Sequence, residues 1–417
     1  MLEDEAGFRI LINQAVYESR HDSVPLNWSS SAGPMAQIVD AIIHEALRRQ
    51  ASDIHIEPLD DCLRVRYRQD GLLQVAGHLP RDLAPVLAAR IKVMAGLDSA
   101  SRLLPQDGHI RFQMGQEKMD LRVSVLPSTL GETIVLRIMA DGSRMLSLDE
   151  LGLSTEGLAR LRQLIHKPAG MRVVSGPMGS GKSSSLYAAL AELARPDTNI
   201  VTLEDPVERH IPGVTQVQIN PKVGLTYAVG LRAALRQDAS LVLASEVRDI
   251  ETAELVIRIA LTGHAAMTTL HTDDAAEAVF RLQDMGIPPY MLAATLNGVV
   301  AQRLLRRVCR HCAAEYEVEA GSEEALMLGR AFHPGLRLWR ARGCEHCHGT
   351  GYQGRLAIQE ILLVTAEVRQ GIMDGLSRHE LKELAQRQGM VTLEQDGIAR
   401  ALAGLTTLAE VRRVIYG

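Results

Sequence analysis

The stretch Gly176-Pro-Met-Gly-Ser-Gly-Lys-Ser-Ser184 decides the fold of this chain. It fits the P-loop pattern G-x-x-x-x-G-K-[ST], whose glycines let several backbone N–H groups point at one anion. The helix that follows adds the positive end of its dipole. We expect Lys182 to reach the β- and γ-phosphates of a nucleotide and the Ser183 hydroxyl to bind Mg²⁺. The residues predicted to contact the nucleotide are Gly176, Pro177, Met178, Gly179, Ser180, Gly181, Lys182, Ser183 and Ser184.

The residues on both sides of this loop favour the same interpretation. Met171–Val174 is typical of a short buried strand. Residues 183–194 predict a helix, because their apolar residues recur on one face. A glycine-rich turn without function is the alternative, and the flanking strand and helix argue against it.

Length and composition limit the class of protein. A chain of 417 residues predicts two or three domains. Its 46% hydrophobic and 23% charged residues are typical of a soluble globular protein. A net charge of −5 argues against general nucleic-acid binding, although it leaves room for a local basic patch. No apolar run reaches the roughly 18–20 residues of a membrane span, and the acidic start lacks a signal-peptide pattern. We therefore expect a cytoplasmic protein that meets a membrane only peripherally, through partners.

The chain divides into an N-terminal segment and linker, 1–33, and two larger units. The first, 34–142, mixes helices with a sheet. The second, 148–417, alternates strands and helices through about residue 305, which predicts a parallel α/β sheet. The second unit includes a cysteine-bearing insert at 308–356 and a mostly helical region at 357–417. The elements predicted in the first unit are helices 35–49 and 83–94 and strands 53–56, 63–67, 72–75, 119–125 and 133–139.

Two strand ends after the P-loop carry acids. Glu204 follows the β-branched stretch 199–203, and Glu246 follows the apolar stretch 241–244. Carboxylates at the carboxyl ends of sheet strands lie where ligands of open α/β sheets bind. Glu204 is a candidate for ordering the Mg²⁺ shell or the attacking water, and Glu246 for polarising that water. Ordinary solvation of a strand end is the alternative for each.

Histidines and arginines complete the list of candidates. His264 begins a strand whose far end carries His271, a residue that could hydrogen-bond the γ-phosphate. Either histidine taken alone is more often structural. Arginine stabilises a transferring phosphoryl group well, but spacing does not select among the candidates of the first unit. These candidates are Arg102, Arg122 and Arg137.

Taken together, the motifs resemble those of the secretion and pilus assembly ATPases that include GspE and PilB. The resemblance covers residue 34 to the end. The matching segments are Gly176–Ser183 for Walker A, Thr202–Glu208 for the Asp box, Leu235–Asp238 with Glu246–Glu254 for Walker B, Leu261–His264 with Thr269–Ala275 for the His box, and Ala51–Pro58, Ile91–Asp98 and Leu104–Gly108 in the first unit.

This resemblance implies a RecA-like core preceded by a PAS-like α+β domain, working as a homo-hexamer. The N-terminal domain of one subunit would bring arginines to the nucleotide. Arg122 and Arg137 lie at matching positions, and Arg102 matches less well. Glu204 and Glu246 would be the acids near Mg²⁺ and water, with Glu246 the general base.

The chain departs from the family pattern in several places. Asp238-Ala239-Ser240 replaces Asp-Pro-Asp, Ser245 replaces a glycine, and Met178 replaces a threonine. Ser245 would either crowd the site or add a hydrogen bond. The family's first N-terminal domain, which docks on a membrane partner, is expected to be essentially absent, as in a truncated or short-form member.

Four of the five cysteines form two C-x-x-C pairs, separated by thirty-one residues. In a cytoplasmic chain, this spacing predicts one tetrahedral Cys₄ zinc site that is structural, because four protein ligands leave no open position. Unrelated free thiols are the alternative. The predicted ligands are Cys309, Cys312, Cys344 and Cys347. In the resembling family, export ATPases have such a subdomain and the retraction ATPase PilT usually lacks it.

The sequence thus predicts a cytoplasmic, peripherally membrane-associated hexameric ATPase with ATP, Mg²⁺ and Zn²⁺ as cofactors. Its work would be pseudopilus assembly in type II protein secretion, with type IV pilus assembly as the alternative. The implied partners are an inner-membrane platform protein like GspF or PilC and an adaptor like GspL or PilM, with no nucleic acid. A retraction or DNA-transfer motor and a non-hydrolysing scaffold are the rivals, the scaffold being suggested by Ser240 and Ser245.

Overall fold

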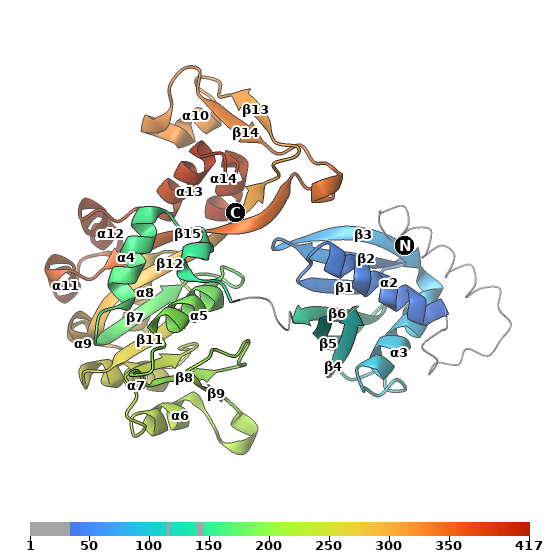
Figure 1. The fold of residues 1–417 in the computed structure, drawn as a ribbon, viewed down its shortest axis with the longest axis horizontal. Coiled ribbons are helices and arrows are strands. Elements are labelled where there is room, and N and C mark those ends of the chain that lie inside the picture. The colour runs from blue at the N-terminus through green and yellow to red at the C-terminus, as the bar shows by residue number, and fades with distance from the viewer. Residues whose placement is uncertain (1–33, 115–116, 140–144) are drawn as a thin grey trace. The chain divides into compact units, whose positions relative to one another are not determined.

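The computed structural model describes residues 34–114, 117–139 and 145–417, which form two compact units divided after Arg144 (Figure 1). The segment and linker predicted for 1–33 lie outside the described residues. Each unit has its own apolar core, so each is described by itself.

The N-terminal unit is a six-stranded antiparallel sheet with helices whose apolar sides share its core. Strand β1 buries Ile54 and Ile56, while Asp53, His55 and Glu57 alternate with them. This alternation leaves the opposite face of the sheet polar. The strands run in the order β3-β2-β1-β6-β5-β4. Its elements are α2 (Pro34–Arg48), β1 (Asp53–Pro58), β2 (Cys62–Gln69), β3 (Leu72–Pro80), η1 (Arg81–Leu83), α3 (Ala84–Met94), β4 (Gln106–Met114), β5 (Glu117–Ser128) and β6 (Gly131–Met139).

Both helices and five strands of this unit were predicted, with ends that shift by several residues. Strand β4 was not. It is an edge strand, and only Ile110 and Phe112 among its described side chains are apolar and buried. With so few apolar positions, the stretch does not stand out as a half-buried strand.

The C-terminal unit is built on a seven-stranded sheet in the order β15-β12-β7-β11-β10-β8-β9. Strand β15 runs antiparallel to β12, and the other neighbouring strands are parallel. The carboxyl ends of the parallel strands therefore share one edge. The strands are β7 (Gly170–Ser175), β8 (Ile200–Glu204), β9 (Thr215–Gln218), β10 (Leu241–Ala244), β11 (Ala265–Leu270), β12 (Leu296–Val308) and β15 (Tyr352–Leu363).

Helices cover both faces of this sheet, and two apolar cores lie between the layers. One core takes its side chains from α4 and α5, the other from α6, α7 and α8. Capping side chains begin several of these helices, including Asp249 at α7 and Asp274 at α8. The elements are η2 (Leu148–Leu151), α4 (Thr155–Ile165), α5 (Lys182–Leu193), η3 (Pro221–Val223), α6 (Tyr227–Ala234), α7 (Ile250–Leu261), α8 (Ala275–Asp284) and α9 (Pro289–Thr295).

A small subdomain and four helices complete the unit. The subdomain lies between β12 and β15, so β15 begins inside the insert predicted at 308–356. The last four helices follow β15: α11 and α12 pack against α9 and α8, and α13 and α14 pack against β15 and β12 (Figure 1). The elements are β13 (Ala314–Glu317), α10 (Glu323–Leu328), η4 (Gly329–Ala331), β14 (Arg337–Arg340), η5 (Glu345–Cys347), α11 (Ala366–Met373), α12 (Arg378–Arg387), α13 (Leu393–Leu402) and α14 (Leu408–Tyr416).

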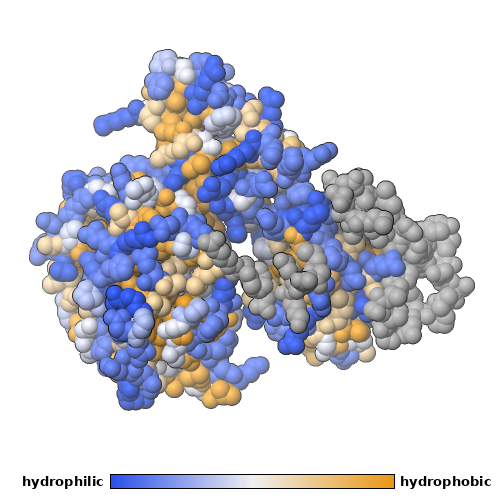
Figure 2. All heavy atoms as spheres, viewed as in Figure 1, coloured by the Kyte–Doolittle hydropathy of each residue, from blue (hydrophilic) through white to orange (hydrophobic). Residues whose placement is uncertain are grey.

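The predicted α/β class with a RecA-like P-loop core is confirmed by this architecture. Hydrophilic residues are interspersed with apolar ones over the visible face of each unit (Figure 2). Within residues 34–114, 117–139 and 145–417, we find no helix of the length and apolar character that a membrane span requires.

Candidate nucleotide site and cysteine cluster

The predicted phosphate loop connects β7 to α5, at the carboxyl edge of the sheet. Gly176 and Gly181 both have positive φ, at 147° and 85°. A Cβ at Gly176 would lie 2.5 Å from the Gln302 carbonyl oxygen, and one at Gly181 would lie 2.8 Å from Gln302 Nε2. Only glycine fits these two positions, because both the backbone angle and the space exclude a side chain.

Two buried glutamines support the loop from the neighbouring strands. Gln302 Nε2 on β12 donates to the Ser180 carbonyl oxygen at 2.8 Å. Its Oε1 accepts from Ser185 Oγ at 2.7 Å and from Gln359 Nε2 on β15 at 2.6 Å. The loop is thus fixed to the sheet by side-chain hydrogen bonds as well as by its own backbone.

The loop offers groups suited to a polyphosphate. Lys182 Nζ donates to the Gly176 and Pro177 carbonyl oxygens, at 2.6 and 3.0 Å, so the ammonium lies over the loop. Burial lowers the pKa of Lys182 to about 8, with Glu246 opposing and Arg303 adding to the shift. Ser180 Oγ is buried without a hydrogen-bond partner, and Ser183 is exposed at the start of α5. A cation, an unpaired hydroxyl and a helix N-terminus fit phosphate oxygens and Mg²⁺.

Glu246 follows β10 at the same edge and is partly open to solvent, its side chain being 23% exposed. Its carboxylate lies 2.8 Å from an Arg248 nitrogen and 3.4 Å from His271 Nε2. The Arg248 hydrogen bond lowers the pKa of Glu246, and the charges of His271 and Lys182 lower it further. The structure therefore brings Lys182, Glu246 and His271 together.

A cavity of about 350 Å³ opens beside Glu246. Asp205, Tyr227 and Arg248 share its lining with Glu246. This volume holds several water molecules, so water reaches the neighbourhood of the carboxylate.

Glu204, the other predicted acid, has a different environment. It is 2% exposed at the end of β8 and accepts from three side chains. Thr202 Oγ1 donates at 2.5 Å and Gln216 Nε2 at 3.0 Å, and Tyr187 of α5 donates through its hydroxyl. Its two oxygens are occupied by protein donors.

His264 and Ser240, both singled out in the sequence, lie at the amino edge of the sheet, opposite the phosphate loop. His264 precedes β11, and its carbonyl oxygen accepts from the Gly170 N–H at the start of β7. Its ring Nδ1 lies 2.9 Å from Thr262 Oγ1. Ser240 precedes β10 and pairs with Asn199. Within one chain, neither joins the group around Glu246.

The candidate arginines belong to the N-terminal unit. Arg122 on β5 and Arg137 on β6 are exposed neighbours in the ladder. Arg137 Nε donates to Asp53 Oδ1 at 2.9 Å. Arg102 lies in the loop between α3 and β4. Arg122 and Arg137 both lie on the polar face of the sheet.

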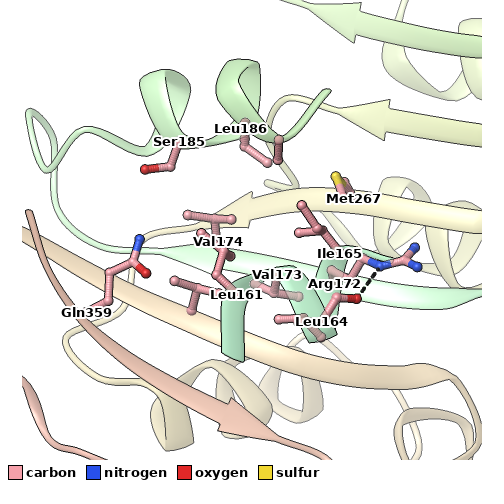
Figure 3. A pocket seen from close by; sticks show the side chains of 12 residues that line it. Leu161, Leu164, Ile165, Arg172, Val173, Val174, Ser185, Leu186, Met267 and Gln359 are labelled. Atoms are coloured by element: carbon pink, nitrogen blue, oxygen red, sulfur yellow. Dashed lines mark hydrogen bonds between the residues drawn. The ribbon is translucent and has the colours of Figure 1, made fainter. Parts of the chain in front are cut away.

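A second cavity, beneath α5, is too small for a nucleotide. It measures about 20 Å³, and apolar residues such as Leu161, Leu186 and Met267 line most of it (Figure 3). Arg172 lies at one end and donates to the Leu164 carbonyl oxygen at 3.1 Å. This cation stabilises the last turn of α4.

The four predicted cysteines of the insert come together. Their sulfur atoms all lie within 4.8 Å of one another. Cys309 and Cys344 are 3.9 Å apart, Cys312 and Cys347 3.8 Å, and Cys344 and Cys347 3.7 Å. Sulfurs at about 2.3 Å from a tetrahedral zinc lie about 3.8 Å apart, so this cluster has the dimensions of a Cys₄ zinc site.

The surroundings of the cluster shift the pKa values of its thiols in opposite directions. Burial opposes ionisation of Cys347, yet N–H groups from Cys344 and Gly351 lower its pKa to about 7. Those N–H groups lie 3.2 and 3.1 Å from the sulfur. Burial raises the pKa of Cys309 to about 12, a shift that a bound cation would reverse.

Sequence reasoning missed the residues that support the site. Gln302 and Gln359 are polar side chains inside apolar strand sequences, a signal that could have found them. Tyr187 and Gln216 carry no local signal, because their partner Glu204 is distant in the sequence.

Fold and site together define a P-loop nucleotide-binding protein with a RecA-like core. A family model described as "Type II/IV secretion system protein" matches residues 29–413, and the chain belongs to that family. It is 45% identical over 387 residues to the type IV pilus assembly ATPase PilB of Thermus thermophilus, covering 93% of this chain and 43% of that protein. It is 44% identical over 397 residues to the type II secretion system protein E of Dickeya dadantii, covering 95% of this chain and 79% of that protein.

Solved structures show the same fold. The Legionella pneumophila ATPase DotB matches with a TM-score of 0.67 at 21% identity, over 90% of this chain and 94% of that one. The pilus retraction motor PilT with bound ADP matches with a TM-score of 0.57 at 24% identity, over 89% and 95%.

Proposed function

We propose that this chain is a cytoplasmic, hexameric motor ATPase that hydrolyses Mg-ATP to drive pseudopilus assembly in type II protein secretion. The observation that carries the proposal is the convergence of Lys182, Glu246 and His271 at the phosphate loop. The names of the relatives support it, since they are secretion proteins and a pilus assembly ATPase.

The geometry supports separate roles for the residues around the phosphates. Loop N–H groups and Lys182 would bind the β- and γ-phosphates, and Ser183 would hold Mg²⁺. Bound Mg²⁺ would neutralise charge that develops on the phosphate oxygens. Glu246 would accept a proton from the attacking water, because its pKa is lowered and it borders a cavity large enough for several water molecules. His271 orients the same carboxylate and is placed to sense the γ-phosphate.

Glu204 takes a supporting role in this proposal. Its carboxylate joins α5 to the end of β8 and to β9 through Tyr187 and Gln216, so it keeps the phosphate-loop helix in register with the end of β8. Binding of metal or water by Glu204 would require these donors to be released.

The remaining candidates belong to an assembly of several chains. We propose that Arg122 and Arg137 approach the nucleotide of a neighbouring subunit, where an arginine stabilises developing charge. His264 would act at a subunit boundary, because it lies at the opposite edge from its own phosphate loop.

Zinc would bind at the cysteine cluster and hold the subdomain together. The subdomain is short and contributes few residues to the apolar core, so metal binding would supply the folding energy it lacks. Four cysteine ligands leave no position for a substrate, which makes the site structural.

Type IV pilus assembly is the second candidate, because the chain resembles PilB about as closely as it resembles protein E. The corresponding partners are a platform protein like GspF or PilC and an adaptor like GspL or PilM at the inner membrane. Binding of the purified chain to each platform protein would separate the two.

Steady-state ATP hydrolysis by the purified chain tests the proposal. We expect turnover that requires Mg²⁺ and falls to background in Lys182→Ala. Background rates for the assembled wild type, with nucleotide still bound, would favour the non-hydrolysing scaffold instead.

A further inference from the structure

Ser245, immediately before Glu246, forms a side-chain hydrogen bond that a glycine cannot form. Its Oγ lies 2.7 Å from the hydroxyl of Tyr227, the first residue of α6. The family resemblance predicts glycine at 245, so this chain has a contact at its catalytic loop that the pattern lacks. The bond joins α6 directly to the residue before the proposed general base.

The backbone of Ser245 is held separately by the two neighbouring strands. Its N–H donates to the Leu203 carbonyl oxygen of β8 at 2.9 Å. Its carbonyl oxygen accepts from Thr269 Oγ1 of β11 at 2.7 Å. Ser245 is therefore held from three sides, and only the Tyr227 bond depends on the side chain at 245.

Tyr227 is well placed to act as a rigid support. Its ring packs against the apolar core and lines the same cavity as Glu246 and Arg248. Burial raises the pKa of Tyr227, so the hydroxyl stays protonated near neutral pH. An aromatic ring has only two rotatable angles and loses little entropy when it is fixed.

We propose that Tyr227 is a positioning residue for ATP hydrolysis, which acts through Ser245 to hold the Glu246 carboxylate beside the cavity of about 350 Å³. This inference rests on the proposed function. Loss of either hydroxyl lets residues 245–249 sample more positions, so the carboxylate spends less time in reach of the attacking water.

The effect is expected on turnover and not on nucleotide affinity. The phosphate loop and Lys182 are fixed by Gln302 and by the loop's own carbonyl oxygens. Tyr227 takes part in none of these bonds, so KM for ATP should stay within about twofold.

A double-mutant cycle on the assembled full chain tests the proposal. The variants are Tyr227→Phe, Ser245→Ala and the pair together. Tyr290→Phe, on an exposed tyrosine of α9, is the matched control. We expect each single variant to lower kcat about three- to tenfold, the range of one net hydrogen bond, and the double variant to be no slower than the slower single. Effects that multiply in the double variant would overturn the pairing.

Hydrogen exchange of the 244–249 segment, read by mass spectrometry, gives a second result that does not need turnover. We expect faster exchange in Tyr227→Phe and Ser245→Ala than in the wild type or Tyr290→Phe. Unchanged exchange and kcat in Tyr227→Phe would overturn the proposal. If the wild type hydrolyses no faster than Glu246→Gln, the proposed function fails, and a change in exchange then shows a structural contact without a catalytic role.

Discussion

Glu204 ends β8 and Glu246 lies just after the neighbouring strand β10, yet their surroundings differ. Glu204 is 2% exposed and accepts hydrogen bonds from Tyr187, Thr202 and Gln216. Glu246 has a side chain that is 23% exposed, borders a cavity of about 350 Å³, and faces cationic or ionisable groups. Both acids lie at the carboxyl edge of the sheet, because each is at the end of a strand. The neighbouring side chains determine which of the two carboxylates is accessible to water.

The two carboxylates are held by different kinds of neighbour. The pKa of Glu246 is lowered by Arg248 and by the charges of His271 and Lys182. Its side chain is partly exposed, so water can reach the carboxylate. Glu204 is stabilised by neutral donors that occupy its oxygens. We therefore propose proton transfer as the role of Glu246 and support of α5 as the role of Glu204.

The largest expected effect is on turnover when Glu246 becomes glutamine. Glu246→Gln should lower kcat by about 10²–10⁴-fold, because the amide cannot take a proton from water. KM for ATP and the thermal midpoint should change little, and a coupled steady-state assay with thermal unfolding measures all three. Turnover within a few-fold of the wild type would remove Glu246 from the chemistry.

The next effect should appear in stability when Glu204 becomes glutamine. Glu204→Gln replaces one carboxylate oxygen, which accepts hydrogen bonds, with an NH₂ group. This buried NH₂ group then faces a side chain that also donates, so the free energy of unfolding should drop by about 1–3 kcal/mol. Denaturant unfolding checks this. Glu208→Gln, an exposed acid four residues further on, is the control. A stable Glu204→Gln protein with lost turnover would give Glu204 a catalytic role.

Nucleotide affinity should depend on pH through Lys182. Its pKa is lowered from 10.5 to about 8, so the ammonium is present below that pH and is lost above it. The Kd for a fluorescent ATP analogue should rise roughly tenfold between about pH 7.5 and 9, while the lowered pKa of Glu246 keeps that group ionised throughout. Lys182→Met should bind weakly with no such dependence, and a flat wild-type profile would place the titration elsewhere.

The smallest effect should come from one donor to Glu204. Thr202→Val keeps the shape but removes a 2.5 Å hydrogen bond, so the free energy of unfolding should fall by about 1 kcal/mol with kcat nearly unchanged. Thr268→Val is the matched control, because the Thr268 hydroxyl is buried without a partner and its loss should be neutral or stabilising. If both substitutions change the free energy of unfolding equally, Thr202 does not stabilise Glu204.

Local patterns predicted the parts of the site that depend on short spacing. The P-loop between β7 and α5 follows from glycines and apolar periodicity within about twenty residues. The cysteine pairs follow from the C-x-x-C spacing, and the antiparallel β12 and β15 bring them together by pairing Val308 with Tyr352.

Other features depend on contacts between distant parts of the chain, which a local sequence pattern does not predict. The burial of Glu204 requires Gln216 on β9 and Tyr187 on α5, and the hydrogen bond of Ser245 requires Tyr227 on α6. Strand β4 escaped prediction because its membership in the sheet rests on pairing with β5 and hardly on apolar residues of its own. Long-range pairing, and not the residue types alone, sets these environments.

A structure of the wild-type hexamer with Mg²⁺ and a non-hydrolysable ATP analogue tests the difference between the two acids most directly. We predict that a Glu246 oxygen lies within hydrogen-bond reach of a water in line with the γ-phosphate, while Glu204 keeps its bonds to Tyr187, Thr202 and Gln216. A Glu204 carboxylate turned onto the water or the metal, with Glu246 still paired to Arg248, would contradict the account.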